Sequence, residues 1–154
     1  MMNDRDDATF LRAALLLGLI SGQDVVRWAD ERIHHDVSPA PAIYDLALTP
    51  AADLSAVRIA LQPLADEAES PVIVGRLLAV VHRDLATGRR SVADTVRVFA
   101  QMRGLIVLPD SVRAELDVFE DTHMLAVSGV EGEVAAVERN VREWLTQFAA
   151  PARA

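Results

Sequence analysis

The chain has 154 residues, of which 51% are apolar and 25% charged, and its formal net charge is −8. This length and composition predict a globular protein with a single domain over residues 1–154, and the acidic balance argues against nucleic acid as a partner. Because the chain has no cysteine and all 15 of its basic residues are arginine, disulfides, zinc–sulfur sites and catalytic thiolates or lysines are excluded.

The first predicted helix runs from about Ala8 to Leu17 and is apolar on nearly all sides, which predicts that it is buried in a core or an interface. The apolar stretch Ala13–Ile20 is too short to cross a bilayer, which takes roughly 20 residues. The chain starts with acidic residues where an export signal needs positive charge. We therefore expect a cytoplasmic protein without a membrane partner, with flexible ends at residues 1–7 and 151–154.

The pattern G-x-x-S-x-x-D-x-V-R occurs twice, at residues 18–27 and 88–97. Its glycine is typical of a helix C-terminus, its serine of the N-cap of a following helix, and its aspartate of that helix's positive end. The pattern therefore predicts the same helix–turn–helix joint at both places. A true internal repeat of two helical hairpins stays open as an explanation.

The rest of the chain also has helical spacing. We expect further helices after Thr49–Pro50, from Ser70–Pro71 and from Asp110 or Ser111, and a buried connector at Gly104–Pro109. Ser128, with Glu131 three residues later, predicts the cap of a final helix whose apolar face carries Val130, Val134, Val137, Val141, Leu145 and Phe148. The prediction is an all-α fold, a compact bundle of seven or eight helices.

Two E-x-x-H pairs could bind metal, Glu31 with His34 and Glu120 with His123. Helical bundles that hold two metal ions need both pairs to project into the core. At 100° per residue, His123 falls on an apolar face and His34 on the solvent side, so we expect no metal site and no cofactor. A metal-assisted or acid–base enzyme that uses His123 with Glu120 stays open as the alternative function.

Positive charge is concentrated in residues 76–103, which hold six arginines and two aspartates. The helix from Ser91 to Arg103 lacks the several amide and lysine side chains that usually read base edges, which favours an acidic protein surface over DNA as the partner. The candidate binding residues are Arg89, Arg90, Arg97 and Arg103, with Trp28 as a contact anchor.

The partner can be another protein or a second copy of the chain. An apolar first helix and a basic segment with acidic complements elsewhere in the chain both favour a symmetric homodimer, the commonest oligomer.

The stretch "ALLLGLISGQDVVRWADERI", followed by "AIYDLALTP", resembles small all-helical bacterial proteins of unknown function. Some such families are immunity proteins encoded beside polymorphic toxins. The resemblance covers about residues 11–50 and rests on the helix–glycine–helix joint and the WAD that follows it. It implies a helical fold and a role in binding another protein, and it supplies no catalytic residues. We therefore expect a non-enzymatic, immunity-like interaction protein of the bacterial cytoplasm.

Overall fold

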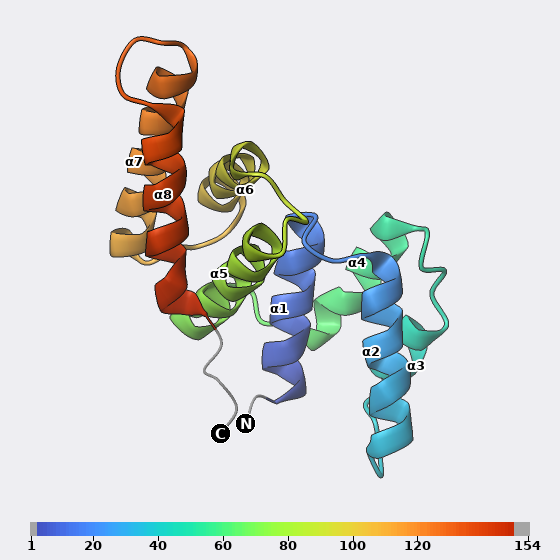
Figure 1. Ribbon diagram of the computed structural model, residues 1–154. Coiled ribbons are helices and arrows are strands. Elements are labelled where there is room, and N and C mark those ends of the chain that lie inside the picture. The colour runs from blue at the N-terminus through green and yellow to red at the C-terminus, as the bar shows by residue number, and fades with distance from the viewer. Residues whose placement is uncertain (1–2, 150–154) are drawn as a thin grey trace, which may run out of the picture. The chain divides into compact units, whose positions relative to one another are not determined.

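A computed structural model describes residues 3–149, and the all-α prediction is confirmed (Figure 1). These residues form eight α-helices and two short 3-10 turns, without a strand. No helix among them has the length and apolar character that crossing a membrane requires. The helices are α1 (Asp4–Leu16), α2 (Gly22–His35), α3 (Pro41–Ala47), α4 (Leu54–Leu61), α5 (Pro71–Ala86), α6 (Val92–Leu105), α7 (Asp110–Val127) and α8 (Val134–Leu145), and the 3-10 turns are η1 (Gln62–Leu64) and η2 (Thr146–Phe148).

The chain divides into two compact units, an N-terminal unit over Met1–Glu69 and a C-terminal unit over Ser70–Ala154. Each unit contains one of the two G-x-x-S joints, which follows the first helix of that unit, α1 or α5. Whether the two units act as the single domain predicted for residues 1–154 stays a prediction.

In the N-terminal unit, α1 packs against α4 and η1, while α2 packs against α3 and α4. The centre of the unit is aliphatic, with Val25, Ile43, Leu46, Val57 and Leu61 fully buried. Two contacts tie η1 and the segment after it to α1. The backbone N–H of Asp66 donates to the Thr9 hydroxyl (2.8 Å), and Arg12 pairs with Glu69 (3.7 Å).

In the C-terminal unit the four helices form a closed ring of contacts, α5 with α6, α6 with α7, α7 with α8, and α8 with α5. Its core includes an aromatic cluster: Phe99 lies 6.0 Å from Phe119 and 6.1 Å from Trp144, measured between ring centroids, and Phe148 follows at 5.0 Å from Trp144. These pairs are tilted or edge-on, the arrangement that aromatic quadrupoles favour. Phe99 and Phe119 are buried, whereas Trp144 is half-buried at the edge of the core.

The structure builds both G-x-x-S joints in the same way. Gly18 and Gly88 have left-handed backbones, with φ of 70° and 75°, and each donates its N–H to the carbonyl three residues earlier. Ser21 and Ser91 then accept the N–H of the aspartate three residues on, at 3.2 and 3.1 Å. Even the helix boundaries agree, because α2 and α6 begin and end 70 residues apart.

The joints differ at one position because their surroundings differ. Gly22 is the first residue of α2, and a Cβ there would collide with the carbonyl oxygen of Ala51 in the connector between α3 and α4. Val92 occupies the matching position of α6 and is buried. The glycine at the start of α2 is therefore required by close packing rather than by its backbone angles.

The predicted start of the last helix is wrong. Ser128 is the C-cap of α7, and α8 begins only at Val134, after an N-cap at Glu133. The reason is the pair Gly129 and Gly132, whose φ values of 74° and 78° keep the intervening residues out of a right-handed helix. Val130, expected on the apolar face of α8, lies instead in the loop and is 73% exposed.

The start of α4 also differs from expectation, because Asp53 and not Thr49 caps it, and the Thr49 hydroxyl donates to the Asp45 carbonyl. The predicted buried connector at 104–109 is only partly correct. Helix α6 continues to Leu105, and the connector after it has no strand and buries Ile106 and Leu108 but exposes Val107.

Helix α1 begins earlier than expected, at Asp4 with Asn3 as its cap, so residues 4–7 of the end predicted to be flexible are helical. Residues 1–2 and 151–154 of those ends lie outside the described residues. The apolar side chains of α1, including Phe10, Leu11 and Leu15, are buried within one chain. This burial removes the exposed first helix as a reason to expect a homodimer.

We expect Ser21→Ala and Ser91→Ala each to lower the free energy of unfolding by about 1 kcal/mol, because each leaves a helix N–H without its cap. Urea denaturation of the full chain measures the loss. Ser55→Ala, at an exposed position inside α4, is the matched control and should cost nothing. Equal effects of Ser55→Ala and Ser91→Ala would contradict the capping role.

Replacing the joint glycines should cost more. Gly18→Ala and Gly88→Ala place a Cβ on a left-handed backbone, at a cost of roughly 1–2 kcal/mol each. Gly104→Ala, in open space inside α6, is the control and should stabilise the chain by about 0.5–1 kcal/mol. Thermal unfolding of the three variants tests the order, and a neutral Gly88→Ala would show that the left-handed joint is not required.

Candidate interaction surface

The four arginines predicted to form a binding site lie in the C-terminal unit, and three of them have carboxylate partners within that unit. Arg90 pairs with Asp84 (3.6 Å) and Arg97 with Asp94 (3.1 Å), while Arg103 pairs with both Asp117 and Glu120. A cation that is already paired is a weaker attractant for an external acid. The basic stretch seen in the sequence is therefore largely neutralised by its own unit.

Asp84 is a buried carboxylate that two of the arginines of this segment neutralise. Its side chain is only 6% exposed, and it faces the guanidinium groups of Arg90 and Arg83, the latter at 3.8 Å. Its backbone carbonyl also accepts the N–H of Arg90 (3.1 Å), which closes the turn after Gly88. A buried carboxylate of this kind needs its cations in place, since an unpaired buried charge is costly. Arg90 therefore stabilises the joint.

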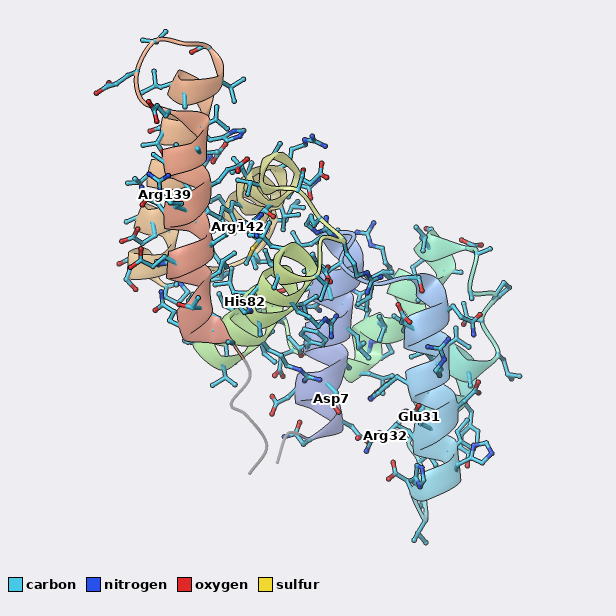
Figure 2. The ribbon with its side chains drawn as sticks, viewed as in Figure 1. Asp7, Glu31, Arg32, His82, Arg139 and Arg142 are labelled. Carbon is cyan, nitrogen blue, oxygen red and sulfur yellow. The ribbon has the colours of Figure 1, made fainter. Side chains whose placement is uncertain are left out.

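Arg142 has a similar structural role. It points from α8 towards the C-terminal end of α5 (Figure 2), where its guanidinium donates to the Leu85 carbonyl (3.4 Å). Arg89 differs from these residues: it is exposed, and it forms no ion pair within residues 3–149. Of the predicted arginines, Arg89 is the one whose charge is directed at solvent.

Trp28, the predicted contact anchor, lies on α2 of the N-terminal unit and is half-buried. The guanidinium carbon of Arg32 lies 6.0 Å from its ring centroid, and Arg32 also pairs with Asp4 of α1 (3.4 Å). Figure 2 shows Arg32 beside Glu31 on α2. The ring is thus part of a contact between α2 and the start of α1, and only part of it faces solvent.

The alternative catalytic pair lies on α7. Glu120 is half-buried and its carboxylate is paired with Arg103, and His123 is also half-buried one turn later. In the other E-x-x-H pair, Glu31 and His34 are exposed, as the helical wheel predicts. Within the described part of the chain, no group of three or more histidine, aspartate and glutamate side chains is arranged to hold a metal ion.

One surface was missed in the sequence, the free end of the α7–α8 hairpin. We define the hairpin tip as residues 121–138, which comprise the end of α7, its loop and the start of α8. Its exposed apolar residues were assigned to helix faces because Val127, Val130 and Val134 have helical spacing. The signal that points to a loop is the pair Gly129 and Gly132, only three positions apart.

No known protein family matches the chain, and neither the curated proteins nor the solved structures include a significant match to it.

The Ser91 hydroxyl lowers the pKa of the Asp94 carboxyl through a hydrogen bond, and the guanidinium groups of Arg97 and Arg90 contribute less. Because the folded pKa lies below the ordinary value of 3.8, the resulting stabilisation is present above that value and is lost as the pH falls through the lowered pKa. We expect Ser91→Ala to raise the pKa of Asp94 towards 3.8, which carboxyl ¹³C NMR measures. No movement of that pKa, or an equal one in Ser55→Ala, would contradict this cause.

Proposed function

We propose that the protein acts in the bacterial cytoplasm by binding another protein, without catalysing a reaction, in the manner of the immunity proteins that residues 11–50 resemble. The observation that carries this proposal is the state of its charges. Each ion pair among the described residues uses an arginine, as in Arg5–Asp66, Arg12–Glu69 and Arg27–Asp24. The chain has 23 acidic and 15 basic residues, so the carboxylates that remain outnumber the free cations.

An uncompensated acidic surface favours a basic partner. Complementary potentials raise the rate of encounter and select the partner more than they add to affinity. Toxic nucleases and other enzymes that act on polyanions carry basic surfaces, and an acidic binder suits them. The same charge repels nucleic acid and anionic membranes.

The alternative function, acid–base chemistry by His123 and Glu120, is supported only by the spacing of the two residues on α7. The pairing of Glu120 with Arg103 favours a structural role for this carboxylate, because the ion pair joins α7 to α6. Glu120→Gln separates the two functions: it should leave the interaction intact and change only the stability.

The proposal predicts a stoichiometric protein partner. We expect the tagged chain, expressed at its natural level in its own bacterium, to retain one basic protein through stringent washing. The two proteins, purified separately, should then form a complex in solution by analytical ultracentrifugation. Recovery of no partner, together with turnover in a hydrolase panel that Glu120→Gln abolishes, would contradict the proposal and establish the enzyme.

A further inference from the structure

We propose that the hairpin tip, residues 121–138, is the surface that contacts the partner, and that the partner presents an apolar patch ringed by arginine or lysine. This inference rests on the proposed function and names the site through which it operates. Figure 1 shows the tip as the free end of the α7–α8 hairpin, where the loop between the two helices turns.

The hairpin tip exposes four apolar side chains. Met124, Val127, Val130 and Val134 are 60%, 64%, 73% and 37% exposed, and they lie within eleven residues of one another. Met124 and Val127 are one helical turn apart on α7, while Val130 and Val134 follow in the loop and at the start of α8. Single exposed valines are ordinary, but apolar side chains gathered at one end of a hairpin are typical of a contact surface.

Backbone hydrogen bonds hold the first part of the tip loop in place. The N–H groups of Val130 and Glu131 both donate to the Leu125 carbonyl, at 3.0 and 3.3 Å, and the N–H of Gly129 donates to the Ala126 carbonyl at 3.2 Å. These bonds satisfy the last carbonyls of α7 and fix the start of the loop. A loop that is held before binding loses less conformational entropy when a partner contacts it.

The hairpin tip is acidic. The tip carries four carboxylates and no arginine, and these acids are Asp121, Glu131, Glu133 and Glu138. A partner must therefore supply the cations. An apolar centre with a charged rim is the usual anatomy of a protein interface, and the flexible side chain of Met124 can adapt to the partner's shape.

The same charges decide between a different protein and a second copy. A symmetric contact between two tips would bring four carboxylates of one chain against four of the other, and like charges across an interface oppose association. Residues 121–138 of the second tip contain no arginine that could compensate these charges, and Arg90, Arg97 and Arg103 are already paired elsewhere. The tip is therefore suited to a basic protein and not to itself.

The probe is a synthetic 18-residue helical peptide with leucine along one face and arginine on the other, titrated into the ¹⁵N-labelled full chain. We expect amide shifts concentrated in residues 121–138. The double variant Val127→Glu/Val130→Glu should weaken binding at least tenfold, because it places carboxylates in the apolar centre. Both sites are exposed, so the variant should fold, which circular dichroism checks.

The matched control is Val72→Glu, which adds the same carboxylate at a 67% exposed valine on α5 of the same unit. It should leave peptide affinity within about twofold of the parent. A peptide with glutamate in place of arginine should not bind. Equal losses in the control and the tip variant would overturn the proposal.

Three further results would overturn it. They are the absence of shifts, shifts centred outside residues 121–138, and a dimer of the chain in light scattering that Val127→Glu dissociates. These failures are distinguishable from failure of the proposed function. If the partner recovered from the bacterium still binds the Val127→Glu/Val130→Glu variant with full affinity, the chain binds a protein through another surface.

Discussion

Two left-handed glycines, each followed by a serine cap, determine where α1 and α5 end and where α2 and α6 begin. Gly18 and Gly88 allow the backbone to leave one helix, and Ser21 and Ser91 satisfy the first N–H groups of the next. The left-handed backbone conformation is strained for a residue with a Cβ, which is why glycine occupies it. The first N–H groups of a helix have no partner within the helix, and the serine hydroxyl supplies one. Each unit of the chain contains one such joint between its first two helices, and other helices of the unit pack onto this pair.

The second joint also holds two arginines in ion pairs within the C-terminal unit. Arg90 and Arg97, which follow Gly88, are held by Asp84 and Asp94 and so stabilise the turn and the helix start. Because these arginines are already paired, they do not neutralise the remaining carboxylates of the chain. The hairpin tip concentrates such carboxylates around exposed apolar side chains. The proposed interaction thus follows from the same local chemistry that builds the fold.

The parts of the fold that depend on near neighbours could be predicted from the sequence, including the all-α class and both joints. The Ser128 cap was mispredicted because S-x-x-E has the same local signal as a true cap, while Gly129 and Gly132 decide the matter through their backbone angles. The candidate site was harder to predict from the sequence. Arg103 pairs with carboxylates 14 and 17 positions away on α7, and only the packing of α6 against α7 reveals that its charge is used.

If uncompensated carboxylates at the tip attract a basic partner, the association rate of the arginine–leucine peptide must depend on salt, and a salt series measures this dependence most directly. Electrostatic steering predicts that the rate constant falls at least tenfold between 0.02 and 0.5 M salt, because screening shortens the Debye length from roughly 20 Å to about 4 Å. The dissociation rate should change much less. An association rate independent of salt would contradict the account, since binding would then rest on apolar contact alone.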